Sequence, residues 1–410
     1  MLKALGPGIL MAGAAIGGSH IVASTQAGAF FGWQLLIVII LVNLFKYPFF
    51  LYGERYTAAT GETILHGYHR LGRGYLYAFF ALNLANAVLN CAGTAFLAAS
   101  LALNLGLEGV LGEKPLAVII SCICASIIIL GRYRLLDKTA KLVIFCLAVS
   151  TVTAVLAAAL QGPAGDPNYE SPSPWTLASI GFLIQFMGWM PAPIDVGAWP
   201  SLWMQSREKE TGHRATMREA MIDFHLGYIT TVVLAVVFLT LGVLVMHGTG
   251  ADFGETGAQF AHTFISMYAN TIGDWATPIV AIAAFTAMFS TALTCVDAWP
   301  RSLATCTALA LGKEKLFTSL HIIWILLTVV TGIVIITWFT ASMGQLLFIA
   351  MVVSFATSPV FAYINYRTIQ AEWVPLQYRP GPLLRCLSWT GMAFLSISTV
   401  AFFYWLIAIR

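Results

Sequence analysis

The sequence predicts an all-α polytopic membrane protein of about eleven transmembrane helices. They form an inverted repeat of five plus five, with helices 1 and 6 broken. Three observations predict this fold class. The 410-residue chain is 59% hydrophobic and 10% charged, whereas soluble domains have roughly 45–50% apolar and about 25% charged residues. Its apolar runs are about 20 residues long, which is enough to cross a bilayer. The first and sixth runs also carry helix-breaking residues near their centres.

The apolar runs divide the chain into two similar halves. They start near residues 5, 30, 76, 116, 138, 175, 222, 275, 316, 341 and 386. We expect a single transmembrane domain over residues 1–410, with repeat one at about 5–162, repeat two at about 175–366 and an extra helix at about 386–408. Because each repeat has an odd number of spans, the second enters the membrane from the opposite side. The first run lacks a signal-peptide pattern, so we expect it to remain as a span.

Basic residues are concentrated in alternate loops. Lys and Arg gather in the segments 55–73, 132–141, 207–218, 301–315 and 367–385, whereas Glu108, Asp166 and Asp252 lie in the loops between. Cytoplasmic loops carry the excess of Lys and Arg. We therefore expect a multi-pass protein of the cell (plasma or inner) membrane, with its N-terminus in the cytoplasm and its C-terminus outside.

The first run is interrupted by Gly17-Gly18-Ser19-His20. At such a break, free carbonyls and half-helix dipoles coordinate a cation without a full set of ionised side chains. Ser19 and His20 add side chains to this position. A buried ionisable residue inside a membrane usually has a functional role. The alternative is that His20 only forms a hydrogen bond across the bundle.

The sixth run is interrupted at Met190-Pro191-Ala192-Pro193-Ile194-Asp195. Pro191 and Pro193 prevent an unbroken helix because proline has no backbone N–H. The Met190 thioether, together with an imidazole, favours transition metals over magnesium or calcium, although methionine is also a common packing residue. A carboxylate such as Asp195 is costly inside a membrane unless it is paired, hydrated or functional. We expect Asp195 to be a cation ligand or proton carrier.

Other polar residues extend the expected pathway. Asn83, Asn86 and Asn90 share one face of the third span, where they either bridge helices or line a wet pathway. Asp297 precedes Arg301 by four residues, which also fits an ion pair on one helix face.

Several segments resemble the Nramp family of divalent metal ion transporters, which implies a LeuT-like fold. The segments are Gly6-Pro7-Gly8-Ile9-Leu10, residues 26–36, Gly131-Arg132-Tyr133 and Met190-Pro191. The family signature Asp-Pro-Gly-Asn is absent, because Gly17, Gly18, Ser19 and His20 occupy those positions. The chain thus looks like a divergent, Nramp-related member.

The resemblance implies a set of metal ligands. The family pattern Ala-x-x-Met-Pro-His aligns with Met187 to Ala192, so the Met187 carbonyl and the Met190 sulfur are expected on the metal, while the histidine is lost. Gly17 stands where the family has a metal-binding aspartate, and His20 where it has asparagine. Since an unpaired divalent charge is prohibitive in a low-dielectric site, we expect Asp195 to supply the missing negative charge.

Together these patterns predict a secondary transporter that moves a divalent metal cation by alternating access. Manganese or iron is favoured and magnesium is possible, with a proton or sodium as the possible coupling ion. The alternative is an amino acid or other small organic solute, whose carboxylate would bind the free amides of Gly17 and Gly18. No catalytic motif indicates an enzyme. We expect the lipid bilayer as environment, no cofactor and no nucleic-acid partner; the oligomeric state stays open, and a monomer is compatible with the sequence.

Overall fold

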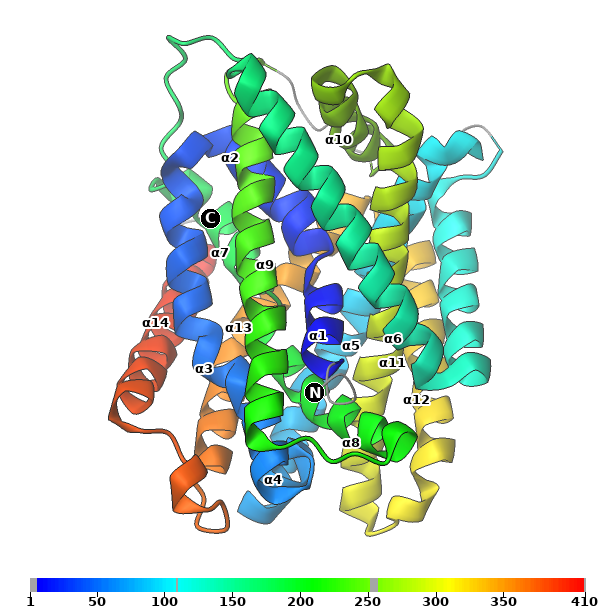
Figure 1. Ribbon diagram of the computed structural model, residues 1–410, viewed down its shortest axis with the longest axis vertical. Helices are drawn as coiled ribbons and strands as arrows, with labels where there is room; N and C mark the ends of the chain where they lie inside the picture. The colour runs from blue at the N-terminus through cyan, green and yellow to red at the C-terminus, as the bar shows by residue number, and fades with distance from the viewer. Residues whose placement is uncertain (1–5, 108–109, 251–256, 409–410) are drawn as a thin grey trace.

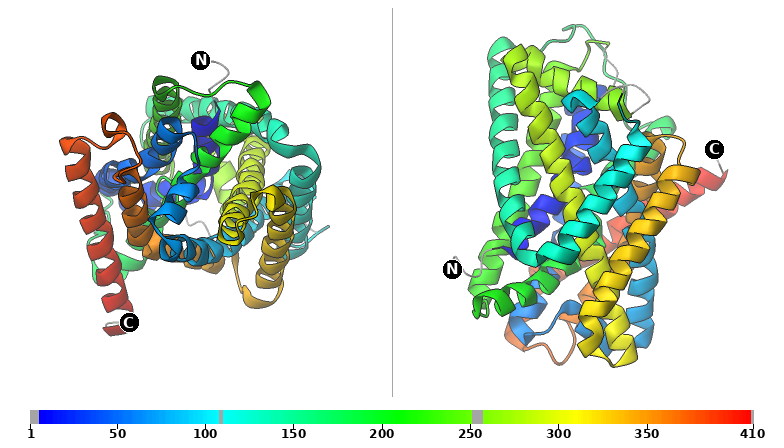
Figure 2. Two further views of the ribbon diagram at one scale, coloured as in Figure 1. Left: turned by 90° about the horizontal axis from the view of Figure 1, so that it is seen from below. Right: turned by 90° about the vertical axis from the view of Figure 1, so that its right-hand side faces the viewer.

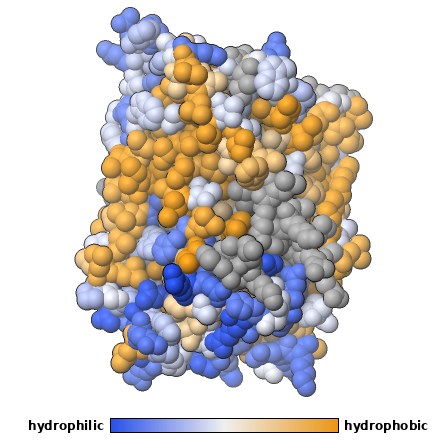
Figure 3. All heavy atoms as spheres, viewed as in Figure 1, coloured by the Kyte–Doolittle hydropathy of each residue, from blue (hydrophilic) through white to orange (hydrophobic). Residues whose placement is uncertain are grey.

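The computed structural model describes residues 6–107, 110–250 and 257–408, and within these ranges it is helical and without strands. Nine helical segments of this part are long and apolar enough to cross a membrane. The long helices run roughly along one direction (Figure 1). Apolar residues form a broad band between two hydrophilic ends (Figure 3). The predicted class, an all-α polytopic membrane protein, is confirmed.

The first span is broken as predicted. Helix α1 (Pro7–Ala15) ends before the glycine pair, and the chain resumes as a π-helical turn (Ser19–Ser24) that continues into α2 (Thr25–Phe31). Gly32 follows with φ of 60°, a backbone conformation that glycine adopts without a Cβ clash. The chain then reverses into α3 (Leu36–Thr60).

The fourth and fifth predicted spans form a single helical element, α6 (Glu113–Gln161). We expected residues 132–141 to form a basic loop. The expectation of a loop was wrong, because the backbone there is helical. A straight helix of 49 residues would be about 74 Å long, far more than a bilayer spans. Accordingly, α6 has two arms that meet near its middle (Figure 1).

The second half of the chain repeats the broken plan. Helix α7 (Ile180–Trp189) is followed by four non-helical residues, a 3₁₀ turn (Ile194–Ala198) and α8 (Trp199–Thr211). The sequence did not predict α10 (Gly257–Ile272), a 16-residue helix in the segment after α9 (Met217–Val245). Helix α14 (Pro382–Ala408) lies at the edge of the bundle in the left view of Figure 2, and its apolar side chains are largely exposed. The remaining α-helices are α4 (Ile64–Leu71), α5 (Arg73–Ala102), α11 (Thr277–Leu311), α12 (Phe317–Val334) and α13 (Met343–Ile369).

Helix α9 holds both halves of the first span in place. A Cβ on Gly227 would lie 2.1 Å from the Gly8 carbonyl oxygen, and one on Gly242 would lie 2.2 Å from the Thr25 carbonyl oxygen. Such small residues allow helix backbones to approach closely inside membranes. Asp223 of α9 also accepts hydrogen bonds from the Gly6 and Gly8 amides, at 3.0 and 2.7 Å. A negative charge at a helix N-terminus is favourable, so α9 fixes the start of α1.

We expect Gly242→Ala to destabilise the protein, because its Cβ would overlap backbone atoms of α2. Overpacking of this kind costs about 1–3 kcal/mol, which thermal unfolding in detergent would detect as a lower Tm. Gly344→Ala is the matched control, since a Cβ there meets nothing within 4 Å. Equal Tm values for the two variants would contradict the close α2–α9 contact.

Candidate functional site

The break in the first span faces α11 and α7. The backbone leaves the helix at Ile16, with φ of −79° and ψ of 68°. A Cβ on Gly17 would lie 2.8 Å from Thr291 Oγ1, and one on Gly18 would lie 2.2 Å from the Trp189 ring. The absence of side chains therefore lets these two neighbours close over the break. An aspartate at position 17 would not fit unless Thr291 moved.

The break in the sixth span leaves backbone carbonyls without intrahelical donors. Helix α7 ends at Trp189, and Met190 is extended, with φ of −90° and ψ of 115°. In an unbroken helix the Met187 carbonyl would accept a hydrogen bond from residue 191, but Pro191 has no N–H. Lys46 of α3 donates to the Met187 carbonyl instead, with Nζ 2.7 Å from its oxygen.

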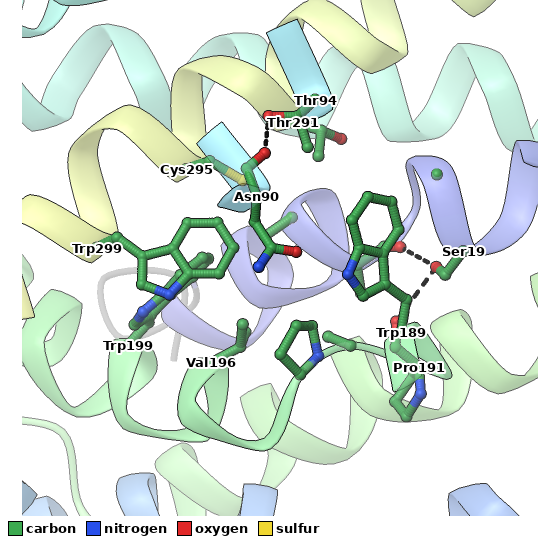
Figure 4. Close-up of a pocket in the computed structure, with 15 residues that line it drawn as sticks. Ser19, Asn90, Thr94, Trp189, Pro191, Val196, Trp199, Thr291, Cys295 and Trp299 are labelled. Carbon is green, nitrogen blue, oxygen red and sulfur yellow. Dashed lines mark hydrogen bonds between the residues drawn. The ribbon is translucent and has the colours of Figure 1, made fainter. Parts of the chain in front are cut away.

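A small cavity lies between the two breaks. Its volume is about 30 Å³, room for a water molecule or a single small ion. In Figure 4 the Asn90 side chain extends between Trp299 on one side and Trp189 on the other. The lining residues come from α1, α5, α7, α8, α11, the break and π-helical turn after α1, and the link and 3₁₀ turn after α7: Ala14, Ala15, Gly18, Ser19, Asn90, Thr94, Trp189, Pro191, Ala192, Pro193, Val196, Trp199, Thr291, Cys295 and Trp299.

Asp195 lies in the 3₁₀ turn, next in sequence to the cavity-lining residue Val196, and 1% of its surface is exposed. Its Oδ2 accepts a hydrogen bond from Trp299 Nε1 at 2.7 Å. Its Oδ1 has no hydrogen-bond partner among the described residues. Asn86 lies within reach of a weak hydrogen bond to the carboxylate, and the positive charge of Lys46 acts on it electrostatically. Oδ1 of Asp195 therefore lacks a well-formed hydrogen bond among the described residues.

His20 is directed away from the cavity. Its Nε2 donates to the Thr231 carbonyl oxygen of α9 at 2.8 Å, and Nδ1 lies 2.6 Å from Ser19 Oγ. The ring also packs edge-on against Phe238 of α9. In this conformation both ring nitrogens have partners, so His20 matches the alternative of a hydrogen bond across the bundle. A role as ligand would require the ring to turn.

Of the predicted site residues, Gly18, Ser19, Pro191 and Pro193 line the cavity, but Met190 does not. Met190 is fully buried at the end of α7. No group of three or more His, Cys, Asp or Glu side chains that could hold a metal lies together in the part of the chain that the structure describes. A cation bound in the cavity would thus depend on backbone carbonyls and the neighbouring Asp195 carboxylate, because the Met190 sulfur lies outside the cavity lining.

The asparagine stripe of α5 packs against α13. Asn86 Nδ2 donates to Thr357 Oγ1 at 3.2 Å, and Asn90 Nδ2 donates to Ser354 Oγ at 3.3 Å. Both side-chain polar atoms of Asn83 lack partners among the described groups. The stripe therefore bridges two helices at one end and keeps unsatisfied polar atoms at the other.

Asp297 lies in a separate polar network. Arg301 Nη2 donates to its Oδ1 at 2.6 Å, and Trp203 Nε1 donates to its Oδ2 at 3.0 Å. His321 Nε2 lies 3.7 Å from Oδ1. The expected ion pair with Arg301 is present, and Asp297 is not among the cavity-lining residues.

Several residues that shape the site were not predicted from the sequence. The most important is Lys46, which fills the second break. Trp189, Trp199 and Trp299 were also missed, and the latter two indoles pack edge to face with centroids 4.7 Å apart. Glu54, two turns after Lys46, is fully buried, and neither carboxyl oxygen has a described partner. A charged residue inside an apolar run was the available signal for both Lys46 and Glu54.

Comparison with known proteins agrees with this architecture. The family model described as natural resistance-associated macrophage protein-like, Nramp, matches residues 8–405. An uncharacterized protein of Pasteurella multocida is 42% identical over 403 residues, which are 97% of this chain and 91% of that protein.

Solved structures share the fold at low sequence identity. A mutant manganese transporter of Eremococcus coleocola has a TM-score of 0.70 at 13% identity, with 98% of this chain and 86% of that chain covered. MhsT in complex with L-phenylalanine has a TM-score of 0.66 at 14% identity, with 97% and 98% covered. The fold is thus the LeuT-like one, with its inverted repeat and broken helices 1 and 6. With most of its length matched by the family model, this chain belongs to the Nramp family, which is a family of transporters and not of enzymes.

Proposed function

We propose that the protein is a secondary transporter that carries a divalent metal cation by alternating access. Manganese or iron is favoured over magnesium, and a proton or sodium is the candidate coupling ion. Membership of the Nramp family supports a metal cargo, and a structure of the same fold is a manganese transporter. Following the distribution of Lys and Arg, we place the protein in the cell (plasma or inner) membrane with the N-terminus in the cytoplasm.

The observation that carries this proposal is the buried Asp195 carboxylate, whose Oδ1 has no well-formed hydrogen bond among the described residues and which adjoins the cavity-lining residue Val196. A buried carboxylate oxygen without a partner is costly, and a cation is a partner that removes this cost. Met190 is close in sequence and offers sulfur, a ligand that magnesium does not use. The Met187 carbonyl is already engaged by Lys46, so a metal bound there would have to displace the ammonium.

We expect Asp195→Asn to lower manganese uptake into proteoliposomes by at least about tenfold, since loss of one charged ligand costs about 1.4 kcal/mol or more. The matched control is Asp166→Asn, because Asp166 lies in an exposed segment and accepts a hydrogen bond from the Asn168 amide at 2.8 Å. Normal uptake by the Asp195 variant would exclude this residue as the main metal ligand.

A second candidate is favoured by a specific observation at the same cavity. Trp189 Nε1 and Trp199 Nε1 are buried N–H donors without a partner among the described residues. In Figure 4 the Trp189 nitrogen faces the centre of the cavity. An N–H donor binds oxygen acceptors and repels a cation, so these donors suit the carboxylate of an amino acid or another small organic solute. The positive charge of Lys46 favours such a solute in the same way.

Two measurements separate these candidates. For a metal cargo, we expect a large excess of mixed amino acids to leave manganese uptake unchanged, and Trp189→Phe to change it by no more than about tenfold, since the ring remains and only a neutral donor worth about 0.5–1.5 kcal/mol is lost. Competition by amino acids, together with a strong defect in the Trp189 variant, would favour the organic solute.

A further inference from the structure

Lys46 is a fully buried lysine near the middle of α3. Its Nζ donates to the carbonyl oxygens of Met187 at 2.7 Å, Gly188 at 3.1 Å and Ala192 at 3.2 Å. An ammonium group has three N–H donors and no acceptor, so these three carbonyls use all of its donors. Lysines near helix ends usually extend their charge to the membrane surface, whereas this one ends inside the bundle.

The three carbonyls are available because the sixth span is broken. Met187 and Gly188 belong to the last turn of α7, whose carbonyls have no intrahelical donors. Pro191 removes the donor that the Met187 carbonyl would otherwise meet, and Ala192 lies in the non-helical link. The C-terminal end of a helix carries partial negative charge. Three converging carbonyls at a half-helix end make a site of the kind that binds a bare cation.

Lys46 is held by carbonyls and not by an ion pair. No salt bridge within 4.0 Å joins it to a carboxylate among the described residues. Asp195 is the charged group that acts on it from the neighbouring 3₁₀ turn. The surroundings of the ammonium therefore resemble those of a metal ion in a carbonyl cage, with one carboxylate farther out.

We propose that the Lys46 ammonium is a built-in substitute for a metal ion, which fills a carbonyl site at the break of the sixth span. The tethered charge satisfies the carbonyls of Met187, Gly188 and Ala192 and closes this site to ions from solution. The break then keeps its shape without a bound ion. This inference does not depend on a metal cargo. If the protein does carry a metal, the Met187 carbonyl is not available as a ligand, because Lys46 already binds it.

The test is to remove the ammonium and supply ions. Lys46→Ala deletes the charged chain and leaves room among the three carbonyls. In detergent with choline chloride, we expect the Tm of this variant to be lower than the Tm of the unmodified protein. When sodium or potassium chloride replaces choline chloride at equal ionic strength, we expect the Tm of the variant to rise by at least about 3 °C. The matched control is Lys114→Ala, because Lys114 donates to a single carbonyl, that of Thr340, at 2.7 Å. Its Tm should not depend on the cation.

Three outcomes would overturn the proposal. The first is a Lys46→Ala protein that is as stable as the original and insensitive to both ions. The second is a variant that neither ion restores, including one that fails to fold in all three salts. The third needs no variant: the unmodified protein should have the same Tm in potassium chloride and in choline chloride, so a requirement for potassium would show that the ammonium does not replace the ion.

These measurements are independent of the cargo, because they use monovalent ions and no transport. If manganese uptake is absent while sodium or potassium restores Lys46→Ala, the cargo proposal fails and the resident ammonium stands. If manganese is transported while neither sodium nor potassium restores Lys46→Ala, the cargo proposal stands and the proposal of a resident ammonium fails.

Discussion

The contact between the Lys46 ammonium and three carbonyls at the end of α7 is the interaction on which the centre of the structure depends. A helix that stops in mid-membrane leaves polar groups where no water can satisfy them, and each would cost several kcal/mol. Here α3 supplies the missing donors from a single side chain. The same contact fixes α3 against α7, and the 3₁₀ turn that follows α7 places Asp195 next to Val196, which lines the cavity.

The two breaks are filled in different ways. In the first span, the glycine pair lets Thr291 and Trp189 approach the backbone, and these neighbours occupy the room that larger residues would need. In the sixth span, the Lys46 ammonium donates hydrogen bonds to the carbonyls at the break. Position 17 lacks the aspartate that the resemblance to the family implies, and Lys46 places a positive charge at the second break. The site is therefore less favourable to a divalent ion than the family pattern implies, and Asp195 becomes the main source of negative charge.

The sequence was sufficient for the parts of the fold that depend on local signals. Glycine and proline disrupt helices wherever they occur, so the breaks near Gly17 and Pro191 were visible without tertiary information. Hydropathy alone located the spans, but it did not predict α10 or the continuous helix of α6. The orientation of His20 depends on the register of a π-helical turn against α9, and the role of Lys46 depends on the distance between two helices 141 residues apart in sequence. No local pattern encodes either relation.

Crystals soaked in manganese and measured at its absorption edge would test most directly whether the paired breaks bind a metal. The account predicts an anomalous difference peak between the two breaks, with Asp195 among the ligands and Lys46 still on its carbonyls. A fully occupied peak elsewhere in the protein, or none at a concentration that supports uptake, would contradict it.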